Sequence, residues 1–179
     1  MKKTLLSAAM IAGLGMAAFA PLSAQAASSG TINFTGRVLA DTCTITVNNL
    51  STSLVTLPQV SATVFGSTVG TVAGATSFPI ALTGCDTNTK NAQIAFTGGN
   101  IDNSTGDLAN ATSGGSNVEI RLLNSSSQVI NTSTQANAPA IAVASGTGST
   151  TLTAEYVSTN AATSAGLVTS SVGFTLTYQ

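Results

Sequence analysis

The sequence of 179 residues contains no histidine and no tryptophan, and only 6% of its residues carry a charged side chain. The absence of histidine excludes Ser-His-Asp and Cys-His catalysis and the common histidine-containing zinc and copper sites. Two cysteines without histidine also make a poor metal site. We therefore identify no catalytic residue, no metal site and no cofactor site, and we do not expect an enzyme.

Two weaker candidates for chemistry remain. Lys90 is the only lysine after residue 26 and the only partner available for a Ser-Lys dyad, but its polar neighbours favour a solvent-exposed loop. Asp102 and Asp107 bracket a polar stretch that resembles part of a calcium loop, yet it lacks the carboxylate density and terminal glutamate of an EF-hand. We interpret both as ordinary polar loops.

Positive charge is the scarcest property of the chain. After residue 26, three basic residues stand against six acidic ones, which gives a net charge of −3. Such a chain has no basic patch to neutralise a nucleic-acid backbone or to hold an anionic membrane surface. Serine, threonine and asparagine fill most polar positions instead, and they suit strands and turns.

The first 26 residues have the three parts of an export signal. Lys2 and Lys3 precede an apolar run at residues 5–20, and Ala24-Gln25-Ala26 forms an A-x-A cleavage site. The alternative, a retained membrane anchor, is disfavoured because the apolar run is short for a bilayer and ends at Pro21. Export to an oxidising compartment predicts a disulfide between Cys43 and Cys85. The 153 residues that remain suffice for one domain.

Short alternating or apolar runs recur after the signal, separated by clusters of glycine, asparagine, serine and aspartate. We expect an all-β fold of the immunoglobulin-like sandwich type. The expected strands are residues 31–39, 43–47, 53–57, 78–82, 93–96, 118–123, 151–157 and 168–178. The glycine-rich stretches 98–100, 113–117 and 145–148 are expected to be hairpin loops.

The two ends of this domain share one pattern. The last expected strand runs to the end of the chain, and its apolar residues alternate with small or polar ones: Val168, Val172, Phe174, Leu176 and Tyr178. The first expected strand alternates in the same way: Ile32, Phe34, Gly36 and Val38. Alone, residues 30–38 fit an ordinary first strand equally well. A terminal strand with an exposed apolar edge, however, invites pairing with another chain.

Four segments carry a family resemblance: residues 30–38 followed by Cys43, residues 57–82 with Cys85, residues 118–124, and the C-terminal stretch with Gly166 and Tyr178. In order and spacing they resemble subunits of fimbriae that the bacterial chaperone-usher pathway assembles. The resemblance covers nearly the whole chain after the signal. Glu155 departs from it, because related subunits often have a basic residue there, and this affects a surface charge rather than the fold.

The resemblance implies an incomplete immunoglobulin-like sandwich that lacks its last strand and is completed by a donor strand from a neighbouring subunit. The implied parts are a signal peptide (1–26), a donor-strand extension (27–39) and a pilin domain (40–179). The implied donor residues are Gly30, Ile32, Phe34, Gly36 and Val38. The implied acceptor groove and chaperone-binding strand contain Gly166, Val168, Val172, Phe174, Leu176, Tyr178 and Gln179.

The implied function is that of a structural subunit of an adhesive fimbrium on the bacterial surface, exported through the periplasm. The implied partners are a periplasmic pilus chaperone, an outer-membrane usher and other copies of this or related subunits, and the single-domain length favours the main shaft subunit. The alternative is a monomeric exported sandwich that binds carbohydrate or protein. Without tryptophan and with only two tyrosines, the chain has few platforms for stacking sugars.

Overall fold

The computed structural model describes residue 33, residues 43–50 and residues 53–179. The expected signal peptide and expected first strand lie outside these residues, apart from Asn33, and so do the donor residues Gly30, Ile32, Phe34, Gly36 and Val38. Among the described residues, no helix has the length and apolar character needed to cross a membrane.

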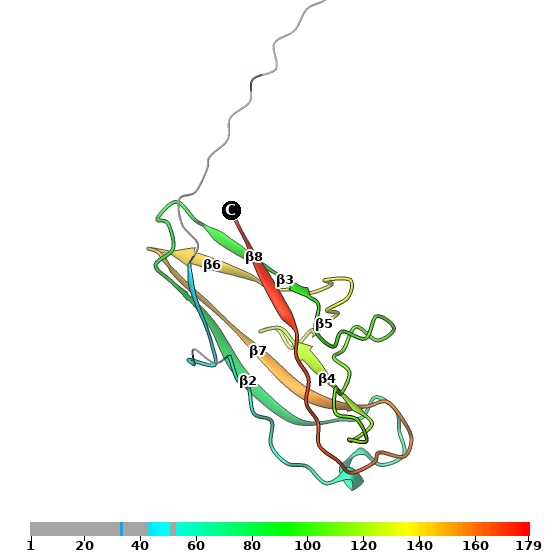
Figure 1. Cartoon of the computed structure of the whole chain (residues 1–179). Coiled ribbons are helices and arrows are strands. Elements are labelled where there is room, and N and C mark those ends of the chain that lie inside the picture. The colour runs from blue at the N-terminus through cyan, green and yellow to red at the C-terminus, as the bar shows by residue number, and fades with distance from the viewer. Residues whose placement is uncertain (1–32, 34–42, 51–52) are drawn as a thin grey trace, which may run out of the picture. The chain divides into compact units, whose positions relative to one another are not determined.

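The described chain is built almost entirely of strands, as Figure 1 shows, which confirms the predicted all-β class. The elements, in chain order, are β1 (Thr44–Val47), the 3-10 helix η1 (Ala62–Phe65), β2 (Val72–Thr83), β3 (Asn91–Thr97), β4 (Val118–Leu123), β5 (Val129–Ile130), β6 (Ala140–Ala144), β7 (Thr147–Ser158) and β8 (Gly173–Tyr178). The expected strand 118–123 coincides with β4, and the expected strands 78–82, 93–96 and 151–157 lie within β2, β3 and β7.

The strands form one curled antiparallel sheet that folds into two layers. In the first layer β2 pairs with β1 and β7, β7 pairs with β4, and β4 pairs with β5. In the second layer β3 lies between β6 and β8. A short pairing of β6 with the start of β7 joins the layers. Within the described chain, β8 therefore ends the sheet and has a partner on one edge only.

The core lies between the layers because each strand turns alternate side chains inward. In β3 the inward residues are Ala92, Ile94 and Phe96, all buried. They share one hydrophobic cluster with Phe78, Ile80 and Leu82 of β2, Ile141 and Val143 of β6, and Leu152 and Ala154 of β7. The expected disulfide is present and joins Cys43, just before β1, to Cys85, just after β2.

Two expected strands differ from the structure. Residues 53–57 form no strand, and in the described chain residues 53–60 make one hydrogen bond, from Asn48 Nδ2 to the Leu54 carbonyl oxygen at 3.0 Å. The last strand begins at Gly173 rather than at Val168, because residues before it bond to a loop instead of a strand. Both segments have strand-like sequences without a complete strand partner.

Other local predictions were mixed. The 145–148 stretch does contain the β6–β7 turn, at Ser145 and Gly146. The stretches 98–100 and 113–117 are not hairpin loops, since they are the two ends of the long β3–β4 connection. Strand β6 was missed because three of its five residues are alanine, which hides the alternation of Ile141 and Val143. Strand β5 has only two residues, too few for a pattern.

Candidate functional site

The described chain has an open surface groove between residues 53–60 and residues 165–174. It consists of two adjoining cavities of about 660 Å³ and 250 Å³. Both cavities share lining residues, which makes them one continuous groove: Leu54, Val55, Leu57, Ile120 and Ser170. Neither wall of this groove is a strand over most of its length.

The floor of the groove is the hydrophobic core itself. Ile120 of β4 lies under both cavities, and buried Phe65 of η1 lines the larger one. Below the smaller cavity are core residues from four strands and the β3–β4 connection: Phe78, Phe96, Leu108, Leu122 and Leu152. These core side chains are buried, and the groove opens to water above them at half-buried apolar residues such as Ile120, Val55 and Leu57. Such exposed apolar surface is unfavourable unless another group covers it.

Tyr156 of β7 also lines the larger cavity, and a bulge in the neighbouring strand makes room for its ring. The β2–β7 register shifts between Ala73 and Thr76, and Gly74 between them has a φ of 69°. A Cβ atom at Gly74 would lie 2.9 Å from the Tyr156 ring, so a glycine suits this position. Burial raises the pKa of the Tyr156 phenol above its ordinary value.

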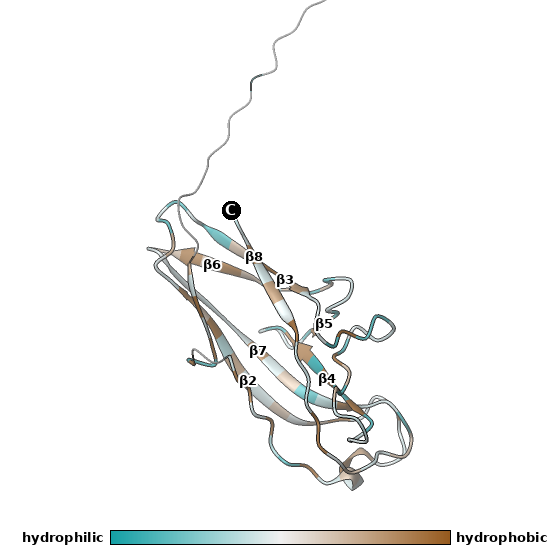
Figure 2. Cartoon of the chain, viewed as in Figure 1, coloured by the Kyte–Doolittle hydropathy of each residue, from teal (hydrophilic) through white to brown (hydrophobic). Residues whose placement is uncertain are grey.

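One wall of the groove is the C-terminal segment. Along β8 the side chains of Phe174, Leu176 and Tyr178 are half-buried and pack on the core, while those between them are exposed. The hydropathy colours of β8 in Figure 2 change along the strand accordingly. Val172 and Val168 continue the inward-facing set into the smaller and larger cavities respectively.

The free edge of β8 carries unpaired backbone groups. Asn91 and Gln179 exchange both backbone hydrogen bonds, with N···O distances of 3.1 and 2.9 Å. Antiparallel pairing alternates hydrogen-bonded and non-hydrogen-bonded residues, so the odd-numbered residues of β8 direct N–H and C=O to β3. The N–H and C=O groups of Phe174, Leu176 and Tyr178 therefore point to the edge that has no strand partner in the described chain.

Exposed apolar side chains lie along the rims of the groove. Leu54 is 60% exposed on one rim and Leu167 is 66% exposed on the other. On the wall formed by residues 53–60, half-buried Val55 and Leu57 alternate with exposed residues, as side chains do along a strand. This wall lacks the backbone hydrogen bonds of a strand. The two walls thus offer unpaired backbone and apolar side chains to the same space.

The structure brings most of the predicted acceptor residues to this groove. Gly166 lines the larger cavity against the backbone of Gly115 and Ser116, where a Cβ atom would collide. At the other end the Tyr178 hydroxyl accepts a hydrogen bond from the Cys43 N–H. Sequence reasoning missed the floor residues, since Ile120 and Tyr156 carry no signal that separates them from ordinary core residues.

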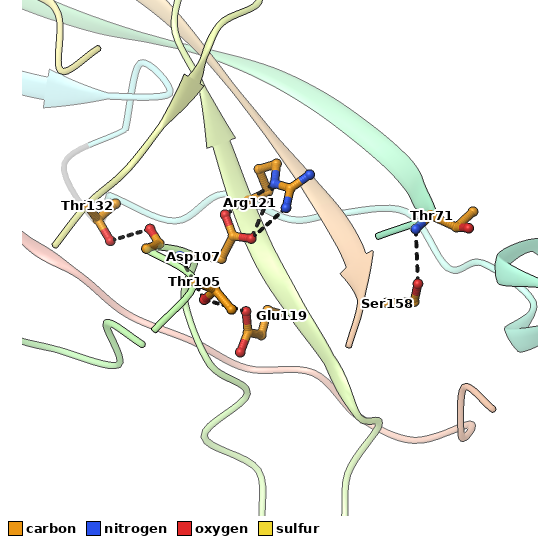
Figure 3. A network of polar contacts seen from close by, with 8 residues as sticks. Thr71, Thr105, Asp107, Glu119, Arg121, Thr132 and Ser158 are labelled. Carbon is orange, nitrogen blue, oxygen red and sulfur yellow. Dashed lines mark hydrogen bonds and ion pairs between the residues drawn. The ribbon is translucent and has the colours of Figure 1, made fainter. Parts of the chain in front are cut away.

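The polar stretch from Asp102 to Asp107, weighed as a calcium loop, has structural partners, and Figure 3 shows those of Thr105 and Asp107. Arg121 binds Asp107 at 2.9 Å, and the side chain of Asp107 is only 2% exposed. The Thr105 hydroxyl donates to Glu119 at 2.8 Å, and Asp102 accepts from Ser104 N–H at 2.7 Å. Among the described residues, no three His, Cys, Asp or Glu side chains gather as a metal site would require.

Comparison with known proteins identifies the family. The sequence profile described as "Fimbrial protein" matches residues 32–179. The chain is 40% identical to the F17 fimbrial protein of Escherichia coli over 93% of this chain and 96% of that protein. It is also 40% identical to the major fimbrial subunit SMF-1 of Stenotrophomonas maltophilia, over 91% of this chain and 99% of that subunit.

Solved structures show the same fold. The crystal structure of the P pilus rod subunit PapA aligns with a TM-score of 0.56 at 22% identity, covering 76% of this chain and 99% of PapA. A type I fimbria protein of Burkholderia pseudomallei aligns with the same TM-score at 24% identity, covering 76% of this chain and all of that protein. These similarities confirm the immunoglobulin-like fold. With a profile that spans the described domain and relatives aligned over nearly their full length, the chain belongs to the Fimbrial protein family.

Proposed function

We propose that this protein is a structural subunit of a bacterial surface fimbria that polymerises by donating its N-terminal segment to the groove of a neighbouring copy. The open groove beside β8 carries this proposal, because it combines half-buried apolar residues with a strand edge that has no partner in the described chain. Adding a strand there satisfies the backbone groups through main-chain hydrogen bonds and buries alternate side chains.

The N-terminal sequence has the properties that such a donor needs. Residues 30–38 span about 30 Å when extended at 3.3 Å per residue, which is comparable to the wall that they would pair with. Burying Ile32, Phe34 and Val38 in the groove contributes about 4.5–9 kcal/mol, at about 1.5–3 kcal/mol per large apolar side chain. Ordering the free segment offsets part of this gain.

Gly36 and the direction of the donor complete the proposal. Every strand pair of the described chain is antiparallel, so we take the donor to run antiparallel to β8. Its C-terminal residues then lie beside residues 167–171, at the larger cavity. Gly36, which lacks a side chain, suits a position where another backbone approaches closely.

The same groove needs a temporary occupant before assembly. An exposed apolar edge in the periplasm would aggregate, so we infer that a pilus chaperone lends a strand to the groove and that an outer-membrane usher brings successive subunits together. Each subunit offers a donor and an acceptor at different places, and such head-to-tail contacts form open fibres. Similarity to major fimbrial subunits supports a place in the main shaft.

Deleting residues 27–38 tests this function. Co-expressed with its periplasmic chaperone, the shortened protein should form a soluble binary complex whose subunits cannot join one another, whereas the unaltered chain should form fibres visible by electron microscopy. Unimpaired fibre growth from the shortened protein would refute the proposal. A stable monomer that needs no chaperone would favour the exported binding module instead.

A further inference from the structure

Residues 167–171 extend the line of β8 toward the larger cavity, although they belong to no strand. Their hydrogen-bonding partner is the β3–β4 connection. The carbonyl oxygens of Leu167, Thr169 and Ser171 accept from the N–H groups of Ser116, Ala111 and Asn100, at 3.3, 2.7 and 2.8 Å. The three donors are far from consecutive, so the loop reaches this segment at separate points rather than as a strand.

Two asparagine side chains supply the bonds that a strand backbone would otherwise make. Asn100 Oδ1 accepts from the Ser171 N–H at 3.1 Å, and Asn110 Oδ1 accepts from the Thr169 N–H at 3.0 Å. Asn110 Nδ2 also donates to the Leu167 carbonyl oxygen at 2.9 Å. Thr169 and Ser171 therefore have both backbone groups bonded on this side, as in a regular antiparallel pair.

Glycines allow the loop to approach this closely. A Cβ atom at Gly99 would collide with the carbonyl oxygen of Ser171, and one at Gly115 would collide with that of Leu167. The hydroxyl groups of Thr112 and Thr169 add a further bond at 2.7 Å. The contacts between the loop and residues 167–171 are thus specific along the whole segment.

The contacts with the loop determine which backbone groups of residues 167–171 face the groove. Because the odd-numbered residues bond to the loop, the N–H and C=O groups of Val168 and Ser170 turn toward the groove, in line with those of Val172, Phe174, Leu176 and Tyr178. Residues 168–178 then offer an edge of about 36 Å at 3.3 Å per residue, against about 20 Å for β8 alone.

We propose that Asn100 and Asn110 are positioning residues that extend the acceptor edge from β8 back to Val168, so that the groove binds a donor strand at the donor's C-terminal end as well as along β8. The proposal rests on the proposed function, in which the groove receives a strand. Asn100 and Asn110 do not touch the donor in this account. They hold the backbone that does.

Two labelled peptides separate this role from a general effect on stability. One has the sequence of residues 27–39, and the other, residues 27–35, lacks the end that would reach residues 167–171. Each is added to the purified complex of the mature chain with its chaperone, and the rate of peptide release from the product is measured in guanidinium chloride. With the wild-type chain, the longer peptide should leave at least about tenfold more slowly.

In Asn110→Ala the longer peptide should be released about as fast as the shorter one, while the shorter peptide keeps its wild-type rate. Asn100→Ala provides a second variant should Asn110→Ala fold poorly, and Asn100→Asp should behave as wild type because it retains the oxygen that binds Ser171. Asn124→Ala is the matched control, since Asn124 also accepts two backbone N–H bonds but in the β4–β5 turn.

Equal acceleration of both peptides by Asn110→Ala, or no effect on the longer one, would overturn this inference while leaving the proposed function intact. Failure of the wild-type complex to take up either peptide would overturn both.

Discussion

Cys43 and Tyr178, 135 positions apart in the chain, are joined by a hydrogen bond from the Cys43 N–H to the Tyr178 hydroxyl, with an N···O distance of 3.3 Å. The bond links the start of the described domain to the last strand, and it closes the end of the sandwich away from the larger cavity. The penultimate residue therefore does more than add an apolar side chain to the edge.

Removing that hydroxyl should weaken the domain modestly. Tyr178→Phe leaves the N–H of buried Cys43 without this partner, so we expect the free energy of unfolding to fall by about 1 kcal/mol. Guanidinium chloride denaturation measures the change. Tyr156→Phe is the control, since its ring lies in the groove and should contribute less than half of that effect through its hydroxyl.

Loss of the disulfide should cost more. The bond between Cys43 and Cys85 has a sequence separation of 42 residues, and closing a loop of that length stabilises a fold by about 4 kcal/mol through the entropy of the unfolded chain. Cys43→Ser with Cys85→Ser should lower the denaturation midpoint accordingly. Reducing agent should have the same effect on the wild-type chain and none on the double variant.

A polar residue on the groove floor should block strand insertion without unfolding the domain. Ile120 is half-buried beneath both cavities, and a donor strand would cover it completely. In Ile120→Asn an amide would be buried without a partner, so uptake of the 27–39 peptide should slow by about tenfold or more. Val129→Asn, at an exposed apolar residue of β5, should take up peptide at the wild-type rate.

Removing one partner of the Arg121–Asp107 ion pair should destabilise the domain more than replacing both partners. Because the Asp107 side chain is only 2% exposed, Arg121→Ala leaves a buried carboxylate without its partner and should destabilise the domain by about 3 kcal/mol or more. Asp107→Asn combined with Arg121→Met should recover part of that loss. A double variant less stable than Arg121→Ala would contradict this account of the pair.

Glu119 and Asp102 should affect the pH dependence of the free energy of unfolding in opposite directions. Burial raises the pKa of Glu119 above its ordinary value, so the folded chain binds this proton more tightly, and this group favours folding as the pH falls through the raised pKa. Hydrogen bonds from Ser104 lower the pKa of Asp102, whose contribution is present near neutral pH and is lost as the pH falls below about 4.

The two carboxyl groups can be separated by substitution. Glu119→Gln should increase stability at pH 7 relative to pH 4, because it removes an ionised buried group while an amide oxygen can still accept from Thr105. Asp102→Asn should decrease stability at pH 7 relative to pH 2, because the amide cannot ionise and the stability that the carboxylate contributes above pH 4 is absent. Urea denaturation from pH 2 to pH 7 measures both slopes, and equal slopes in the two variants would exclude these assignments.

The sequence predicted those parts of the fold whose neighbours are ordinary strands. Strand β4 was predicted to the residue, and the alternation from Phe174 to Tyr178 correctly indicated β8. Residues 53–57 alternate in the same way yet form no strand, because strand formation needs a backbone partner that the described chain does not place beside them. Local alternation reports burial on one face and says nothing about hydrogen bonds along the edge.

The candidate site, like the fold, was predictable from the sequence only in part. The family resemblance placed the predicted acceptor residues on the C-terminal segment alone, and Gly166, Val168, Val172 and Phe174 of that set line the groove, whereas the opposite wall and the floor come from parts of the chain that only the fold brings together. Asn100 and Asn110 were unpredictable for a further reason. In a chain rich in asparagine, only the positions of Ser171 and Thr169 distinguish these two from the others.

The disulfide also determines how the domain would respond to tension. A pull on the chain ahead of Cys43 passes through the sulfur atoms to Cys85, so the chain between them, which includes β1, η1 and β2, bears no load. Nearly a quarter of the sequence is thus a mechanically shielded loop that cannot be peeled from its end. In a fibre exposed to shear, the covalent link would direct force past β1, which pairs with β2 over only four residues.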